Sequence, residues 1–210
     1  MIPRIWACAV LLGAICIAGA ARAADPKNPN WPCVQPKVPV ISAGQVWAGP
    51  PIDEQDRSWR DDPAVQRLVQ ELAPRRMSLD DAYQKIDTYA AGLGPEEKAK
   101  ALSLLFTGLL QTINAERTEI INGIERYDQK QKALAENIRA KTSEMDALLS
   151  KTDPTDAERE KQKKLEEDLN WQTRIFDERE HSLRYVCESP VLLEKRIFEL
   201  SRHLMAQLDQ

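Results

Sequence analysis

The chain has 210 residues with 29 basic and 33 acidic side chains, which give a net charge of −4 at pH 7. This acidic balance does not favour binding to nucleic acid or to an anionic membrane surface. Aromatic residues make up only 6% and charged residues 30% of the chain, a composition typical of elongated helices rather than of a compact α/β core.

Residues 1–23 have the layout of a secretory signal peptide. An early positive charge, Arg4, precedes an apolar run from Ile5 to Ala21, and the small residues around Arg22 predict cleavage after Ala23. The apolar run is at the short limit for a membrane span, so an uncleaved anchor is the alternative. We expect a periplasmic protein with no membrane span after cleavage, or a fully secreted one. The mature net charge would be −6, with 27 basic and 33 acidic residues.

Export leaves two of the four cysteines in the mature chain. Cys8 and Cys16 belong to the signal, so Cys33 and Cys187 remain. Because an even pair in an oxidising compartment usually forms a disulfide, we predict a Cys33–Cys187 bond. Counting back from a helix turn near residue 153 places Cys187 opposite Ile120. Two unpaired buried thiols are the alternative.

Residues 24–61 are predicted to form a proline-rich extended segment. Proline fixes the backbone torsion and lacks an amide donor, which favours polyproline-like backbone. The segment also carries apolar side chains to bury, such as Val38 and Trp47, which a disordered linker usually lacks. We expect the disulfide to hold it along the helices, with Trp31 capping the core of a helical base.

Two short helices should follow. The first begins at Asp62, an acidic cap followed by proline, and ends at Pro74. The second begins at Ser78, where Asp81 completes a weaker variant of the capping box, and ends at Gly92. Each has one apolar face at helical spacing.

Two long helices then account for most of the chain. The third helix should run from Pro95 to about Lys151, and the fourth should start after Pro154, where Thr155 and Glu158 form a capping box. Both have a sustained 3-4 apolar spacing, typical of a coiled coil. The apolar seam positions are Phe106, Leu110, Ile113, Ile120, Ile124, Tyr127, Leu134, Ile138, Met145 and Leu148, then Leu165, Leu169, Phe176, Leu183, Val186, Leu193, Ile197, Leu200 and Leu204.

Polar residues interrupt both seams and are interpreted as layers that fix the register of the two helices. They are Arg117, Gln131 and Lys141 in the third helix, and Gln172 and Arg179 in the fourth. The heptad phase continues past Pro190, which predicts a kink there and not a new domain.

The predicted fold class is all-α: a small helical base with a long antiparallel coiled-coil hairpin, preceded by the extended segment. The apolar stripe is wide near residues 101–113 and 191–200 and narrow between them, and a wide stripe needs more than one partner. We therefore place the base of the helical domain 62–210 at residues 62–115 and 187–210. The projecting hairpin comprises residues 116–186.

No motif in the chain indicates catalysis. Glu178 and His181 have the spacing of one metal-binding pair, but carboxylate-bridged di-metal bundles need two such pairs and two further glutamates. There is no CxxCH, glycine-rich phosphate loop or HExxH. We predict no catalytic residue, no metal and no cofactor. A metal-dependent enzyme using Glu178 and His181 is the weakest alternative.

The fourth helix carries the candidate partner-binding residues Trp171, Lys163, Lys164 and Glu166. Trp171 lies beside the seam of a slim arm, where it either packs along the neighbouring helix or serves as an exposed anchor for another protein. The charged run 156–168 is either a solvated face or a contact surface.

Two functions of different classes follow from this sequence. The first hypothesis is a non-enzymatic exported interaction or scaffold protein whose hairpin engages a partner protein, with self-association through the hairpin as a second option. The alternative is a helical ligand-binding or sensory domain. Its pocket would lie in the base among Trp31, Trp47, Trp59, Tyr83 and Phe106.

Overall fold

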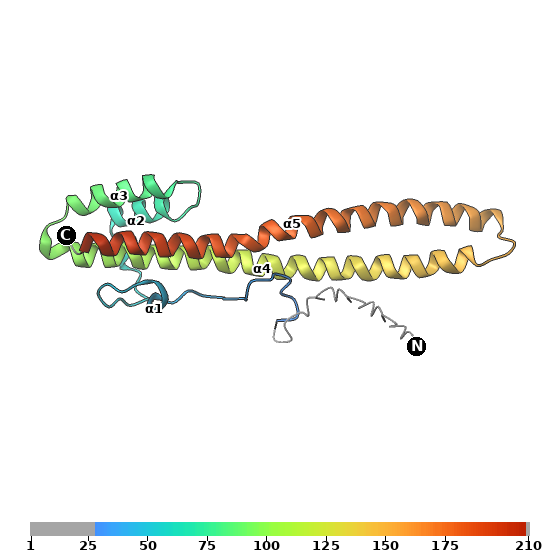
Figure 1. The fold of residues 1–210 in the computed structure, drawn as a ribbon, viewed down its shortest axis with the longest axis horizontal. Helices are drawn as coiled ribbons and strands as arrows, with labels where there is room; N and C mark the ends of the chain where they lie inside the picture. Colours follow the sequence, from blue (N-terminus) through green and yellow to red (C-terminus); the bar gives the residue numbers. More distant parts are fainter. Residues whose placement is uncertain (1–27, 209–210) are drawn as a thin grey trace, which may run out of the picture.

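The computed structural model describes residues 28–208, so the predicted signal peptide and its cleavage site lie outside the described residues. Across those residues the chain forms helices and no strands (Figure 1). The elements are α1 (Ala43–Val46), the single 3₁₀ turn η1 (Ser58–Arg60), α2 (Pro63–Leu72), α3 (Leu79–Ala91), α4 (Pro95–Leu149) and α5 (Asp156–Leu208). The all-α prediction is confirmed.

The long helices α4 and α5 lie side by side and antiparallel along the whole molecule (Figure 1). Pro95 occupies the first turn of α4, where its missing amide costs nothing. At the start of α5, the Thr155 amide donates to Glu158 Oε2 (2.8 Å) and the Glu158 amide donates to Thr155 Oγ1 (3.3 Å). The predicted capping box therefore begins the second arm of the hairpin.

The helices α2 and α3 form a short pair beside the base of the hairpin, where α2 packs on α4 and α3 packs on α5 (Figure 1). The Asp62 side chain caps α2 by accepting from the amides of Ala64 and Val65, and Ser78 Oγ caps α3 by accepting from the Asp81 amide. The core beneath them is continuous and almost fully aliphatic. Its largest members include Leu72, Ile86, Leu102, Leu105, Phe106, Leu109, Leu193, Ile197, Leu200 and Leu204.

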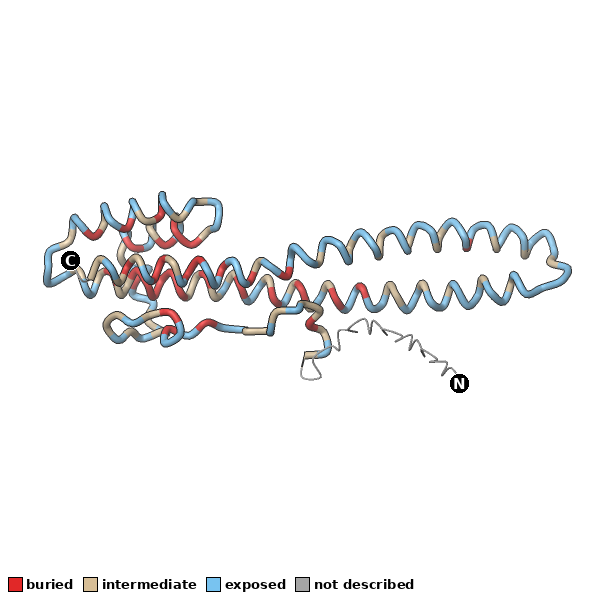
Figure 2. The backbone as a smooth tube through the Cα atoms, in the orientation of Figure 1, coloured by how far each residue is buried: buried red, intermediate tan, exposed pale blue. Residues whose placement is uncertain are grey.

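Buried residues are concentrated at this base, and they become sparse toward the tip of the hairpin (Figure 2). Between residues 132 and 186 only Leu165 is buried. The α4 seam positions 134, 138, 141, 145 and 148 are half-buried, at the spacing that the heptad pattern predicts. The arm is therefore a two-helix coiled coil with one narrow seam and solvent on its other sides.

The sequence predicts that the wide apolar stripe near the end of α5 is buried, and this prediction is wrong for several of its side chains. Val191, Leu192 and Phe198 remain 43–46% exposed. The reason is that α4, α3 and α1 pack against α5 without enclosing it, so part of its surface stays in solvent. Val186, assigned to the seam, is also 43% exposed, one turn before Pro190.

The sequence predicts an extended segment before α2, but the segment is not extended throughout. It contains the single turns α1 and η1. At α1 the Ser42 amide donates to the Gln45 side chain (2.9 Å), a capping-box contact. At η1 the Asp56 carboxylate accepts from both the amide and the hydroxyl of Ser58 (2.8 Å each), and these bonds lower the pKa of Asp56. We use the name strap for residues 28–41, the extended part.

Side chains of α4 satisfy the backbone of this segment, which has no sheet to pair with. Asn114 pairs with Ile41 in both directions, accepting from its amide (3.0 Å) and donating to its carbonyl (2.8 Å). The Gln111 amide donates to the carbonyls of Glu54 (2.9 Å) and Asp56 (2.7 Å). Because buried backbone groups need partners, this polar stripe on α4 fixes the path of the strap and the loop after it.

Candidate functional site

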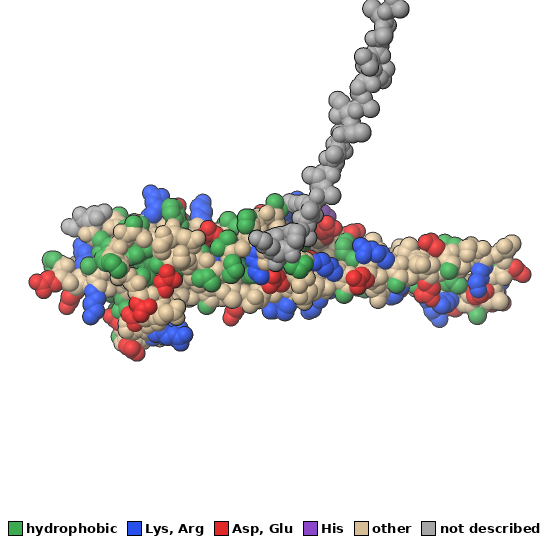
Figure 3. All heavy atoms as spheres, turned by 90° about the horizontal axis from the view of Figure 1, so that it is seen from below, with side chains coloured by type: hydrophobic (Ala, Val, Ile, Leu, Met, Phe, Trp, Pro, Cys, Tyr) green, Lys and Arg blue, Asp and Glu red, His purple; other side chains and the backbone are tan. Residues whose placement is uncertain are grey.

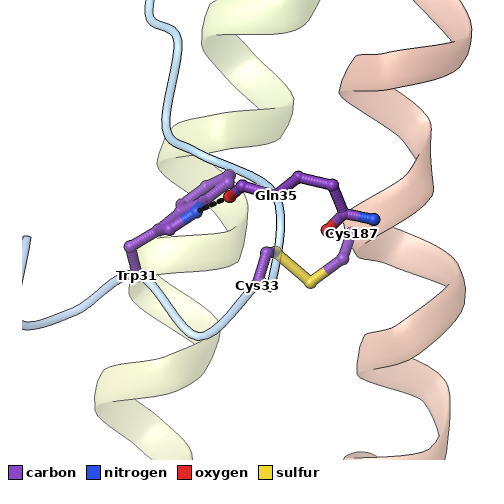
Figure 4. Close-up of a disulfide and its surroundings, with 4 residues drawn as sticks. All are labelled: Trp31, Cys33, Gln35 and Cys187. Atoms are coloured by element: carbon purple, nitrogen blue, oxygen red, sulfur yellow. Dashed lines mark hydrogen bonds between the residues drawn. A yellow bond between two sulfur atoms is a disulfide. The ribbon is translucent and has the colours of Figure 1, made fainter. Parts of the chain in front are cut away.

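The predicted pair of cysteines is joined: Cys33 of the strap and Cys187 of α5 form a disulfide with a Cα–Cα distance of 5.5 Å (Figure 4). The bond lies where the broad base narrows into the arm. We call this region the shoulder and define it by Trp31, Cys33, Gln35 and Cys187.

Trp31 anchors the strap at the shoulder and not over the base core. Its indole is 7% exposed and packs with Ile121 and Ile124 in a small cluster separate from the main core. Its Nε1 donates to the Gln35 carbonyl at 2.7 Å (Figure 4). The expectation that Trp31 caps the base core is therefore wrong. The disulfide holds the strap near Ile120, as predicted, and this position is too far along α4 for the indole to reach the base.

Arg117 joins three parts of the chain at the inner side of the shoulder. Its side chain is 2% exposed, and its guanidinium donates to the carbonyls of Pro190 in α5 and Val38 in the strap (3.2 Å each). Glu194 lies 3.7 Å away and supplies the opposite charge. Burial lowers the pKa of Arg117, and Glu194 partly opposes that shift. The polar residue predicted to fix helix register therefore also fixes the strap.

Other polar residues hold the register along the arm. Gln131 Nε2 donates to the Phe176 carbonyl (3.1 Å), and the Tyr127 hydroxyl donates to the Arg179 carbonyl (3.1 Å). Farther out, Lys141 pairs with Asp168 across the seam, and this contact lowers the pKa of Asp168. These cross-helix contacts support the interpretation of Gln131 and Lys141 as register layers, whereas the Gln172 amide donates to Asp168 of its own helix (3.0 Å).

Trp171 is 61% exposed on the outer side of α5, so packing along the neighbouring helix is excluded for it. Two ion pairs flank it on the same helix, Lys164 with Glu160 (3.3 Å) and Arg174 with Glu178 (2.9 Å). Together with Glu167 these residues follow 3-4 spacing along one face. We call this set the outer stripe: Glu160, Lys164, Glu167, Trp171, Arg174 and Glu178.

The four predicted partner-binding residues do not form one cluster, although all are exposed. Lys164 lies two turns before Trp171 on the same face, about 10 Å along the axis. At 3.6 residues per turn, Lys163 is rotated from Trp171 by about 80° and Glu166 by about 140°. The structure thus places Lys164 beside Trp171 and directs Lys163 and Glu166 to other sides of the arm. Figure 3 shows side chains of both charge signs mixed along the arm.

The single metal-type pair does not assemble into a metal site. The Glu178 carboxylate accepts from Arg174, and His181 is exposed. Among residues 28–208 no group of three or more potential metal ligands lies together.

The aromatic residues proposed to line a base pocket are packing elements. Trp47 stacks on Phe106 with ring centroids 4.3 Å apart, and Tyr83 stacks on His203 at 4.2 Å. Trp59 is buried and donates from its indole to Gln111 (2.9 Å). None of the five proposed residues lines the cavity between α2 and α3, the cavity at the disulfide or the cavity beside Pro51 and Lys100.

Sequence analysis missed the side chains that hold backbone segments in place. The clearest case is Arg196, 6% exposed, which donates to the carbonyls of Leu72 and Met77 and so ties α5 to the turn between α2 and α3. Leu72 is the last residue of α2, where carbonyls lack helical partners. The available signal was the position of Arg196, three residues after Leu193 and four before Leu200, next to the apolar face of α5.

Comparison with protein-family models, with curated proteins and with solved structures found no match for this chain. The geometry therefore defines the class of protein by itself: an all-α, disulfide-linked protein with a helical base and a projecting two-helix arm. None of the helices within residues 28–208 has the length and apolarity needed to cross a membrane.

Proposed function

We propose that this protein is exported to an oxidising compartment, the periplasm in a bacterial cell, and acts there as a non-enzymatic interaction protein. Its projecting hairpin engages a partner protein through the outer stripe of α5. The exposed indole of Trp171 is the observation that carries this proposal.

An exposed tryptophan on a narrow coiled coil has no structural role to explain it. The Trp171 side chain is 61% exposed, while Gln172 and Phe176 occupy the seam positions that follow it. Tryptophan is among the residues that contribute most to binding when they are buried at an interface. One ion pair lies on each side of Trp171, and together the two pairs provide the polar rim that such an interface has.

The spacing of the outer stripe indicates the shape of the partner surface. Its members recur every three or four residues over about five turns of helix. A partner helix laid along α5 would meet all of them, with an apolar hole for Trp171 and charges complementary to the alternating Glu and Lys or Arg residues. Export is supported by the Cys33–Cys187 bond, because such bonds persist in oxidising compartments.

The test is site-specific photocrosslinking in cells that export the protein. A benzoylphenylalanine at position 171 is expected to give a discrete adduct with one protein, and the same probe at position 198 is expected to give none. Phe198 is the matched position, because it is another exposed aromatic residue of α5 but lies on the base.

The purified partner should then bind the purified protein, and Trp171→Ala should weaken that binding by about 30-fold, the effect of losing a typical hot-spot residue. Phe198→Ala should leave it unchanged. If adducts form only between copies of this chain, the partner of the outer stripe is a second copy and the hairpin self-associates. No adduct from position 171, or equal binding of the Trp171→Ala variant, would contradict the proposal.

A further inference from the structure

A cavity of about 690 Å³ lies at the shoulder, directly beside the disulfide. The strap forms one wall through Cys33 and Gln35, and α4 and α5 form the others. This volume is within the range that small-molecule sites occupy. The cavity is separate from the outer stripe and from the core of the base, so a ligand here would be a function beyond partner binding.

Two glutamines that line the cavity, Gln35 and Gln131, each have a buried amide oxygen without a hydrogen-bond partner. Gln131 is 8% exposed, and its Nε2 is engaged by the Phe176 carbonyl at 3.1 Å. That bond fixes the orientation of the amide, so Oε1 is left as a buried acceptor without a donor. Gln35 Oε1 is likewise buried and unpartnered, and the Gln35 side chain reaches over the disulfide toward α5 (Figure 4).

Charged groups of both signs line the same cavity. Arg139 of α4 and Arg184 and Glu180 of α5 take part in no ion pair within the described part of the chain. Guanidinium groups recognise carboxylates with two parallel hydrogen bonds, whereas amide oxygens and a glutamate accept from ammonium and amide groups. Phe176 and Leu183 add apolar walls between them.

We propose that the shoulder cavity binds a small zwitterion of the amino-acid or short-peptide class. The ligand's carboxylate pairs with Arg184 or Arg139, and its ammonium or amide N–H groups donate to the free oxygens of Gln131 and Gln35. Its apolar side chain lies against Phe176. Buried acceptors without donors destabilise a structure unless something fills them, and this ligand class carries the required donors and charges in one molecule.

The test uses nuclear magnetic resonance on the full exported chain with the disulfide intact. The probe is the dipeptide Ala-Leu, and the reporters are the Trp31 indole N–H, which donates to the Gln35 carbonyl, and the backbone amides of Cys33 and Gln35. Saturable shifts of these signals are expected. The N-acetylated and C-amidated forms of the same dipeptide should each bind at least tenfold more weakly, because each lacks one charge.

Variants separate binding from folding. Gln131→Met keeps the shape of the side chain and removes the acceptor, so it should weaken Ala-Leu binding at least tenfold. Gln172→Met is the matched control, because Gln172 also has a buried unpartnered oxygen on the seam but does not line the cavity. If Gln131→Met fails to fold, Arg184→Gln at the exposed rim provides the same test.

Three results would overturn the inference. The first is the absence of shifts at about 10 mM Ala-Leu, a concentration that saturates even a millimolar site. The second is equal binding of the capped and uncapped dipeptides, which would show that the cavity does not recognise the two charges of a zwitterion. The third is equal loss of affinity in Gln131→Met and Gln172→Met, which would make the effect one of general stability.

Discussion

Removing the Cys33–Cys187 bond is expected to destabilise the whole helical fold and not only the strap. The bond joins residues 154 positions apart, and the loop that it closes contains α1, α2, α3, α4 and the first part of α5. In the chain-entropy description, a crosslink across a loop of this length stabilises the folded state by about 5 kcal/mol. That is comparable with the entire unfolding free energy of many domains, about 5–15 kcal/mol.

The strap should stay docked in the folded state of the reduced protein, because other contacts also hold it. Lys37 pairs with Glu125 at 2.5 Å, Trp31 is 7% exposed, and Asn114 binds both backbone groups of Ile41. The loss of stability should therefore reflect the freedom gained by the unfolded chain. With a urea dependence of about 2 kcal/mol/M, a loss of about 5 kcal/mol should lower the unfolding midpoint by about 2.5 M.

The assay compares urea unfolding of the oxidised protein with that of the Cys33→Ser/Cys187→Ser double variant, followed by circular dichroism. Reductant should lower the unfolding midpoint of the oxidised protein and leave the midpoint of the double variant unchanged. A shift below about 0.5 M would refute the entropy argument, since it corresponds to roughly 1 kcal/mol. Alkylation of the denatured protein without reductant should add nothing to the mature chain; two adducts would show that the bond is absent.

Three further substitutions test particular contacts. Gly108→Ala should destabilise the fold by about 1–3 kcal/mol, because its Cβ would meet Val69 Cγ2 at 2.6 Å, whereas Gly123→Ala in the open part of α4 should stabilise it by about 0.5–1 kcal/mol. Thermal unfolding measures both, and equal effects would refute the packing argument. Arg117→Met should cost about 1–3 kcal/mol in urea unfolding, since it leaves two carbonyls without their donor; a change below about 0.5 kcal/mol would contradict this. At the tip, hydrogen bonds from Lys151 and Thr155 lower the pKa of Glu158 from 4.5 to about 2. A carboxyl with a lowered pKa stabilises the turn above about pH 4.5 and loses that effect as the pH falls through about 2. A carboxyl titration by nuclear magnetic resonance with a midpoint near 4.5 would refute it.

The helices could be predicted closely because their signals are local. Proline at the first turn of α4 and the Thr155–Glu158 box of α5 are set by residues within four positions of each helix end. The seam followed from periodicity, since half-buried positions recur along α4 as the heptad pattern requires. The cysteine pair followed from counting, because the predicted signal cleavage would leave only two.

The path of the strap could not be predicted, because it depends on contacts between residues far apart in sequence. The bonds from Asn114 to Ile41 and from Arg117 to Val38 span more than 70 residues. No periodicity indicates which backbone groups an amide side chain on α4 will bind. The exposure of Trp171 was equally open, since a residue beside a seam can turn toward the partner helix or away from it.

The strap, the disulfide and the shoulder cavity all lie where α5 bends relative to α4. Pro190 sits inside α5 without an amide donor, and Figure 1 shows α5 bending between the base and the arm. A bend in one helix of a pair opens space that seam side chains alone do not fill. Arg117 binds the Pro190 carbonyl on the base side of that bend, and Cys33 of the strap is bonded to Cys187 on the arm side. The remaining volume between the strap and the helices is the cavity, and its lining includes Gln35 and Gln131 with their unpartnered amide oxygens. The proline-rich strap thus serves as the third wall of a site that two helices could not enclose.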